Sequence, residues 1–298
     1  MLRPQNEYVN SWGGRALNIT FYGVRGSTPC PCDANQRYGG NTACVVVECD
    51  DADPVVLDLG TGLRLWGLDW PADRVFSATA LVSHLHWDHI QGLPFFEPVN
   101  RPGAALNVFG PTQVDCSLAD AINGFMSPPY FPVTIDAFAG TFTFTEAPDH
   151  FTVDGYEVRT IPVPHPGPTV GYRIERDGVS IAYLPDHQQP GCGSTVVSDE
   201  VRSLCQGVDL LIHDAQYSDA EFAKKSDWGH CTYDYAMEVA RQSGVRRVAL
   251  FHHDPSHNDD QLDEIAQMMA KVGAAAGLEE VIVASERLQI SLAPSRTR

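Results

Sequence analysis

Residues 80–89, Ala-Leu-Val-Ser-His-Leu-His-Trp-Asp-His, decide the fold: an apolar run typical of a buried strand leads directly into an H-x-H-x-D-H cluster. Alternation at the strand end can aim His84 and His86 at one point, while Asp88 and His89 can face a second point. Imidazole and carboxylate groups at this density suit zinc or a similar divalent ion. A hydrogen-bonded turn rich in histidine is the alternative, but these four side chains would be crowded without an ion to neutralise and orient them.

Three more candidate ligands occur downstream, each at the end of an apolar run. His165 follows residues 160–164, Asp186 follows residues 181–185, and His252 follows residues 248–251. Because sites assemble where strands end at one edge of a sheet, we expect these side chains to join the first cluster. The set is large enough for two divalent ions if Asp186 bridges them, with zinc expected first and manganese as the other possibility.

Short β-branched runs that end in Gly, Pro, Asp or His predict many strands along the chain. They span residues 17–22, 43–48, 55–58, 80–83, 106–109, 141–145, 156–163, 171–175, 179–184, 210–213, 248–251, 281–284 and 288–292. Helical spacing predicts helices through residues 262–272 and after Thr232, a candidate N-cap, and also near 113–123 and 195–206. Since strands outnumber helices, a wholly parallel βαβ sheet fits poorly. We expect a loose leader over residues 1–14 and a single domain of two sheets flanked by helices over 15–298.

The composition excludes several classes of protein. A net charge of −18 opposes binding to duplex nucleic acid and to anionic lipid, although a local metal cluster could still attract a small anion. Neither a membrane-spanning run nor the apolar segment of a signal peptide is found, so we expect a cytoplasmic protein. The eight cysteines contain no C-x2-C pair, which argues against a zinc ribbon and favours incidental thiols over a redox pair.

On these motifs the chain, from about Phe21 to its end, resembles the metallo-β-lactamase fold superfamily of hydrolases. The resemblance implies a four-layer αββα sandwich of the α/β class, with the site at one edge. It implies one metal held by His84, His86 and His165, a second held by Asp88, His89 and His252, and Asp186 as the bridge. The segment Asp58-Leu59-Gly60-Thr61-Gly62 resembles one in which the Asp supports the metal loop without binding the metal.

Two further segments resemble the tRNase Z and phosphodiesterase branch. Residues 211–215, Leu-Ile-His-Asp-Ala, are similar to its His-Glu-Ala-Thr loop, and residues 229–232, Gly-His-Cys-Thr, are similar to its His-Ser-Thr loop. The resemblance gives His230 contact with the scissile phosphate and a part in proton transfer. His230 is expected to open a helix, where backbone N–H groups favour an anion. His213 could contact substrate or could only orient His230.

The chain also departs from tRNase Z. That family inserts a long tRNA-gripping arm between its Gly-Tyr strand and the bridging Asp, whereas only fourteen positions separate Tyr172 from Asp186 here. The Gly-rich turn at residues 23–29 resembles that of bacterial phosphodiesterase-like members, and its Arg25 could meet a phosphate or form a surface salt bridge. The aromatic, proline-rich segment 124–132, which includes Met126–Pro132, could be a lid, stack on a base, bury a dimer contact or simply cover the core.

These features lead to one hypothesis about function: a binuclear metal phosphodiesterase that cleaves a small anionic phosphodiester, such as a cyclic nucleotide or cyclic phosphate. A metal-bridging hydroxide would attack phosphorus, His230 would assist proton transfer, and Asp88 could orient the water. The alternatives are an RNase Z-like endoribonuclease acting on RNA 3′ ends, a lactone or thioester hydrolase, and a metal-stabilised binding module without turnover. No duplex nucleic acid or membrane partner is expected, and a homodimer is possible.

Overall fold

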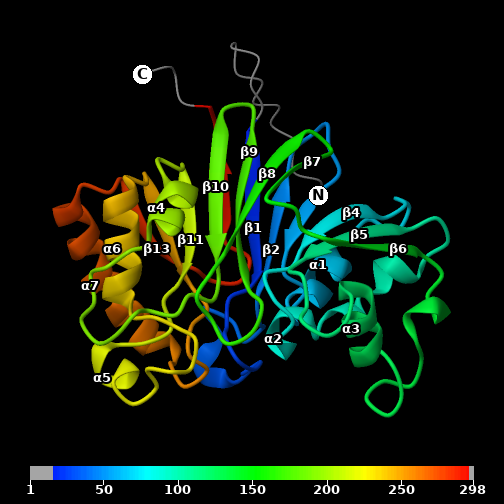
Figure 1. The fold of residues 1–298 in the computed structure, drawn as a ribbon, viewed down its shortest axis with the longest axis horizontal. Helices are drawn as coiled ribbons and strands as arrows, with labels where there is room; N and C mark the ends of the chain where they lie inside the picture. The colour runs from blue at the N-terminus through cyan, green and yellow to red at the C-terminus, as the bar shows by residue number, and fades with distance from the viewer. Residues whose placement is uncertain (1–15, 295–298) are drawn as a thin grey trace.

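Two seven-stranded sheets stack face to face between two layers of helices in the computed structural model, which describes residues 16–294 (Figure 1). Helices α4, α6 and α7 cover one sheet, and α1, α2 and α3 lie against the other. The αββα sandwich expected from the resemblance is therefore confirmed. The leader predicted over residues 1–14 lies outside the described residues, and the single-domain boundary at 15–298 stays a prediction.

The first sheet has the order β14-β1-β2-β3-β4-β5-β6. Its strands are β1 (Leu17–Gly23), β2 (Cys44–Glu48), β3 (Val55–Leu57), β4 (Ser77–Leu81), β5 (Ala105–Gly110), β6 (Thr141–Glu146) and β14 (Gln289–Leu292). Strands β3 to β6 run parallel, while β14, β1 and β2 pair antiparallel. The sheet is therefore mixed. This agrees with the prediction that a chain with fewer helices than strands does not form a wholly parallel sheet.

The second sheet has the order β13-β12-β11-β10-β9-β8-β7. Its strands are β7 (His150–Val153), β8 (Tyr156–Pro162), β9 (Val170–Arg176), β10 (Val179–Leu184), β11 (Leu210–Asp214), β12 (Arg247–Phe251) and β13 (Glu280–Val283). Strands β10 to β13 run parallel and the others antiparallel. All the predicted strands are present within a few residues of their expected ends. Only β7 was not predicted, because it is a four-residue edge strand with just two half-buried apolar side chains, Phe151 and Val153, and so its pattern is too short to recognise.

Most of the helices are short. They are α1 (Leu63–Asp69), α2 (Trp87–Ile90), α3 (Leu118–Phe125), α4 (Asp199–Cys205), α5 (Asp219–Phe222), α6 (Tyr233–Ser243) and α7 (Asp259–Ala276), with 3-10 turns η1 (Asp33–Asn35), η2 (Leu93–Phe95), η3 (Glu97–Asn100) and η4 (Ile135–Ala137). Thr232 caps α6, as predicted, by accepting a hydrogen bond from the backbone N–H of Tyr235. The helices expected near 113–123 and 195–206 begin later, at α3 and α4, where Ser117 and Ser198 act as N-caps.

Three apolar layers hold the sandwich together. Phe21, Tyr183 and Phe251 pack between the two sheets, Trp66, Phe76 and Phe96 pack under the helices of the first sheet, and Leu204, Val239 and Leu262 pack under those of the second. A central strand such as β10 is buried on both faces and so reads as a continuous apolar run. This double burial explains why the strands could be found from sequence.

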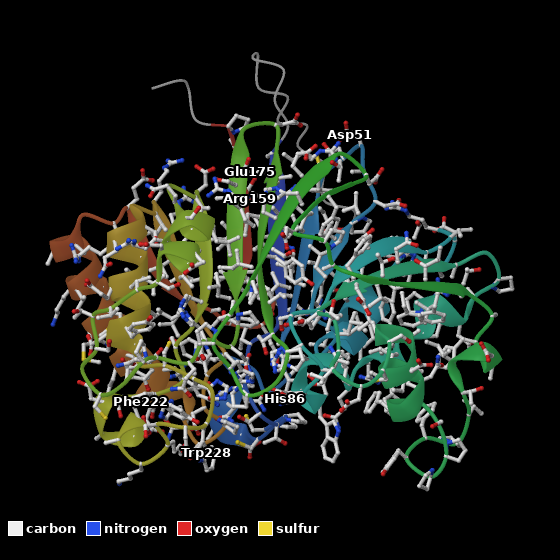
Figure 2. All side chains as sticks on the ribbon, viewed as in Figure 1. Asp51, His86, Arg159, Glu175, Phe222 and Trp228 are labelled. Atoms are coloured by element: carbon white, nitrogen blue, oxygen red, sulfur yellow. The ribbon has the colours of Figure 1, made fainter. Side chains whose placement is uncertain are left out.

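The carboxyl ends of β3, β4, β10, β11 and β12 meet at one edge of the sandwich (Figure 1). Figure 2 shows His86 at this lower edge, near the level of Phe222 and Trp228, whereas Asp51 and Glu175 lie at the opposite end. Among the described residues, no helix is long and apolar enough to cross a membrane. The candidate site therefore lies where loops from both sheets meet.

Candidate active site

The structure brings all seven predicted ligands together. Their donor atoms form overlapping groups in which every atom lies within 4.8 Å of the others: His84 with His86 and His165; His84 with His89 and Asp186; Asp88 with His89 and His252; and Asp186 with His230 and His252. Asp186 belongs to two of these groups and lies 3.7 Å from both His84 and His165 and 3.1 Å from His89. The geometry thus matches two donor sets that share one carboxylate.

The H-x-H-x-D-H cluster is not simply a strand end. Strand β4 stops at Leu81, His84 and His86 lie in the loop that follows, and Asp88 and His89 lie on the single helical turn α2. The stretch is therefore not a strand beyond Leu81, although His84 and His86 do share one donor group and Asp88 and His89 another, as the sequence predicts. Successive residues of a helix point about 100° apart, which turns Asp88 and His89 toward the same donor group from different directions.

Hydrogen bonds fix how three of the imidazoles are turned. The Nδ1 atom of His84 lies 3.1 Å from Ser83 Oγ, that of His89 lies 2.7 Å from Asp58 Oδ2, and that of His165 lies 2.7 Å from the carbonyl oxygen of Gly229. Carboxylate and carbonyl oxygens only accept, so Nδ1 donates in the latter two pairs. Since Ser83 Oγ donates to Asp58, it accepts from His84. Each Nε2 is left as a lone pair that faces the centre, the arrangement found for metal-binding histidines.

These ring nitrogens face one another and the carboxylates of Asp88 and Asp186. Nε2 of His89 lies 3.2 Å from Nε2 of His252, and Nε2 of His165 lies 3.2 Å from Nδ1 of His86. Nε2 of His84 is buried and has no hydrogen-bond partner. Buried acceptor atoms that converge in this way require a cation among them. The residues therefore fit divalent metal ions.

Burial and charge set the protonation of the donors. Burial lowers the pKa of His84, His86 and His165, which favours the neutral imidazole that binds metals. Burial alone would raise the pKa of Asp186, but His252, His89 and other histidines outweigh it and hold that pKa well below its ordinary value. The Asp186 carboxylate is therefore ionised and available as a ligand.

His89 differs from the other histidines. Burial lowers its pKa, but the carboxylates of Asp88, Asp186 and Asp58 outweigh burial and raise the pKa well above its ordinary value. Without a metal, a proton on His89 therefore offsets the negative charge of these carboxylates. Metal binding must displace that proton, which makes the affinity depend on pH.

Asp58 supports the metal loop from behind, as the resemblance implies. Its side chain is fully buried and accepts hydrogen bonds from the backbone N–H of Ser83 at 2.6 Å, Ser83 Oγ at 2.9 Å, His89 Nδ1 at 2.7 Å and Tyr183 Oη at 2.8 Å. Its φ of 59° lies in the left-handed region that non-glycine residues rarely adopt. Four hydrogen bonds offset this backbone cost and place the carboxylate beside His89.

His230 lies beside the donor groups and is paired with Asp214. The Nδ1 atom of His230 lies 3.1 Å from Asp214 Oδ2 and 3.6 Å from Asp186 Oδ2. Asp214 also accepts hydrogen bonds from the backbone N–H groups of His187 and Gln216, both at 3.1 Å. Burial, together with the charge of Asp186, raises the pKa of Asp214 well above its ordinary value. Burial lowers the pKa of His230.

Asp214 was not assigned a role from sequence, although it is the residue that contacts His230. Its signal was its position at the end of β11, where Leu210–Asp214 places it next to His213 at the site edge. His213 itself turns the other way: its Nδ1 donates to the Asp214 carbonyl at 2.7 Å, and its Nε2 lies 2.9 Å from His187 Nδ1. The structure thus places His213 behind the site.

The expectation that His230 opens a helix is wrong. Helix α6 begins at Tyr233, and the side chain of Gln189 accepts the backbone N–H of its N-cap, Thr232, at 3.1 Å. The N–H of Tyr235 is taken by Thr232. These two N–H groups are bonded within the protein, so the helix terminus does not supply the anion site that was expected around His230.

The Gly-rich turn at residues 23–29 contacts the donor groups directly. The backbone N–H of Ser27 donates to Asp88 Oδ2 at 2.7 Å, and a Cβ on Gly26 would lie 2.4 Å from Nδ1 of His252. Among the residues that the structure describes, Arg25 forms no surface salt bridge, the second of its two expected roles. It is fully buried, and its guanidinium donates to the carbonyl oxygens of Gly39, Asp254 and His257. Arg25 therefore ties this turn to the chain beyond His252.

Comparisons with known proteins agree with this geometry. The beta-lactamase superfamily domain matches residues 72–253. Ribonuclease Z of Natronomonas pharaonis is 25% identical over 302 aligned positions, which cover 84% of this chain and 92% of that protein. Human tRNase Z, short form, superposes with a TM-score of 0.65 at 22% identity, covering 92% and 98% of the two chains. A diphosphatase from the PhnP family gives 0.67 at 17% identity, covering 93% and 98%. The chain therefore belongs to the β-lactamase superfamily, as a metal-dependent hydrolase of the metallo-β-lactamase fold.

Proposed function

We propose that this hydrolase is a phosphodiesterase with two divalent ions, zinc first and manganese as the alternative. One observation carries the proposal: Asp186 faces both donor sets, and His230, held by Asp214, lies beside the same carboxylate. His84, His86 and His165 would hold one ion, Asp88, His89 and His252 the other, and Asp186 would bridge. Bound divalent ions lower the pKa of water and neutralise phosphate oxygens, the chemistry that phosphodiester hydrolysis needs.

Side chains of the protein would supply the proton transfer and orient the attacking water. Hydrolysis adds water to phosphorus and breaks one P–O ester bond, and the leaving oxygen must gain a proton. His230 can deliver that proton from Nε2, and the Asp214 carboxyl group, which lies against its Nδ1, can replace the proton. Asp88 could also orient the attacking water, and Ser27 holds its Oδ2 in place. His213 supports this arrangement from behind through Asp214.

Two features support a small substrate, such as a cyclic nucleotide or another cyclic phosphate. Strands β9 and β10 are joined by the turn at Asp177 and Gly178, so no arm is inserted before Asp186. The net charge of −18 disfavours long polyanions, whereas divalent ions would attract a small phosphate locally. A cytoplasmic location and a homodimer remain predictions.

The second candidate is cleavage near RNA 3′ ends. Curated relatives named ribonuclease Z align over most of their length at 24–27% identity, and these names favour RNA more directly than a small ester. A lactone or thioester substrate is the third candidate. The position of the Asp214–His230 pair beside the donor groups favours phosphate over these acyl substrates.

The test compares substrates on metal-loaded enzyme. Zinc- or manganese-loaded protein should hydrolyse bis(p-nitrophenyl) phosphate and at least one cyclic nucleotide, and His86→Ala should lose this activity. Faster cleavage of a tRNA precursor than of any cyclic nucleotide would favour the second candidate. Absence of phosphodiester turnover with either metal, or full activity in His86→Ala, would overturn the proposal.

A further inference from the structure

An aromatic groove is lined in part by Trp87, the residue between the candidate ligands His86 and Asp88. Trp87, Gln91, Gly124, Phe125 and Tyr130 line a volume of about 470 Å³, within the range usual for small-molecule sites. Trp87 also starts helix α2. The groove is thus continuous along the backbone with the residues that would hold the metal.

The rings of this groove are exposed rather than packed away. The side chains of Trp87 and Tyr130 are 71% and 80% exposed, although apolar rings of this size normally gain by burial. The five lining residues carry no charge. The only side-chain amide among them, that of Gln91, offers both donor and acceptor atoms. This surface suits a flat, neutral group with hydrogen-bonding edges.

The segment that carries Tyr130 is fastened to the fold. Phe131 forms an edge-to-face pair with Phe95 of η2, with ring centroids 5.9 Å apart. The backbone N–H groups of Tyr130 and Phe131 both donate to the carbonyl oxygen of Ser127 at 2.9 Å. The Phe131–Phe95 pair joins the segment to η2 and the two backbone bonds hold its turn, which reduces the ordering cost of binding.

We propose that this groove binds the nucleobase of a small nucleoside phosphodiester whose phosphate lies at the metal centre. The inference rests on the proposed function and adds the substrate class. Aromatic faces stack on any base, and the Gln91 amide can meet a base edge. A mononucleotide ester fits better than a polynucleotide, since the lining has no Lys or Arg to follow a phosphate backbone and the chain carries a charge of −18.

Gly124 offers a clean way to fill the groove. It lies in α3, its φ is not positive, and a Cβ added there would meet no atom within 4 Å. Gly124→Leu should therefore fold and project into the groove. Gly191 is the matched control, because it is equally open by the same measure but does not line the groove.

The experiment compares two esters with the same leaving group: thymidine 5′-(p-nitrophenyl phosphate), which carries a base, and methyl p-nitrophenyl phosphate, which does not. Metal-loaded enzyme should show a kcat/KM at least about tenfold higher for the thymidine ester, the size expected for one stacked base. Gly124→Leu and Trp87→Ala should remove most of this preference, while Gly191→Leu keeps it. A wild-type ratio near one, or a ratio that Gly124→Leu leaves intact, would overturn the groove proposal alone.

A binding measurement separates this proposal from the proposed function. If neither ester is hydrolysed, the phosphodiesterase assignment fails, and the groove is judged by NMR saturation transfer to the adenine protons of adenosine, which has no phosphate. Wild-type protein should give transfer and Gly124→Leu should lose most of it; equal transfer in both would overturn the groove. Two other occupants would also overturn the groove proposal. An RNA occupant is indicated if a short RNA is the better substrate and its cleavage is unaffected by Gly124→Leu. A second copy of the chain is indicated if light scattering shows that this substitution breaks a dimer.

Discussion

The carboxyl group of Asp214, the last residue of β11, lies 3.1 Å from Nδ1 of His230, which lies in the loop before α6. Asp214 is fully buried and also accepts two backbone N–H bonds, so its position is fixed by the fold. His230 is then held in one orientation beside Asp186. The pair can act as a unit in which Asp214 orients His230 and His230 transfers the proton.

This pairing predicts an effect that depends on the leaving group. His230→Ala should lower kcat by about 10²-fold or more for an alkyl phosphodiester, because the alkoxide needs a proton, and by much less for a p-nitrophenyl ester. Asp214→Asn should follow the same pattern with a smaller loss. The double variant should be little worse than His230→Ala, since the two residues act together. Equal losses on both esters would contradict the proton-transfer role.

Asp58 should control how tightly the metal is held. Asp58→Asn replaces one of the two carboxylate oxygens with a donor, which disrupts the bonds to His89 and Ser83. We expect metal affinity to fall about 10- to 100-fold, measured by competition with a coloured chelator. Tyr183→Phe removes only one of the four hydrogen bonds and should have a smaller effect. Wild-type affinity in Asp58→Asn would show that the bond to His89 does not matter for binding.

Metal removal should lower both activity and stability. A chelator should abolish phosphodiester hydrolysis, and zinc should restore it. The thermal unfolding midpoint should fall on chelation, because a ligand that binds only the folded state stabilises it by about 4 kcal/mol at a thousand times its Kd. Metal analysis should find two ions per chain in the wild type and fewer in His86→Ala. His150→Ala, at an exposed histidine outside the site, is the control and should bind two.

The buried His213 should make stability depend on pH. Burial lowers the pKa of His213 from 6.5 to about 4. His213 is therefore protonated below about pH 6.5 in the unfolded chain, but only below about pH 4 in the folded chain. The unfolded state then binds more protons, and stability falls as the pH falls through this window, by about 3 kcal/mol in total. The free energy of unfolding of the metal-free protein can be measured by urea denaturation between pH 7 and 4.5. Plotted against pH, it should have a shallower slope in His213→Asn than in the wild type. Parallel slopes in the two proteins would argue against this contribution.

Gly26 should be required for the site more than for the fold. A Cβ there would lie 2.4 Å from Nδ1 of His252 and 2.9 Å from Nε2 of Gln216, so Gly26→Ala must displace one of these side chains. We expect weaker metal binding and at least about a tenfold loss of kcat/KM, because a misplacement of about 1 Å near a reacting centre can cost 10²-fold. Circular dichroism should show an intact fold. Gly191→Ala, at an open position, should behave as wild type.

Much of the architecture follows from short patterns in the chain. The strands could be found because buried strands of stacked sheets are apolar on both faces, as β10 and β11 are. The H-x-H-x-D-H residues could be found because three His and one Asp fall within six positions after an apolar run, a density that suits a divalent ion. The edge strand β7 could not, since its four residues include only two half-buried apolar side chains.

The roles of the residues around the donors depend on contacts that form only in the folded chain. His213 and Asp214 are neighbours in one strand and point to opposite faces, so the backbone pleat turns one away from the site and brings the other to His230. Arg25 is buried by chain segments more than two hundred residues away, which no local pattern predicts. Local composition determined which residues could bind a metal, because burial periodicity and ligand chemistry are properties of short segments. The pairing of Asp214 with His230, the contact of Ser27 with Asp88 and the groove between α2 and α3 depend on distances between distant segments, which only the folded chain sets.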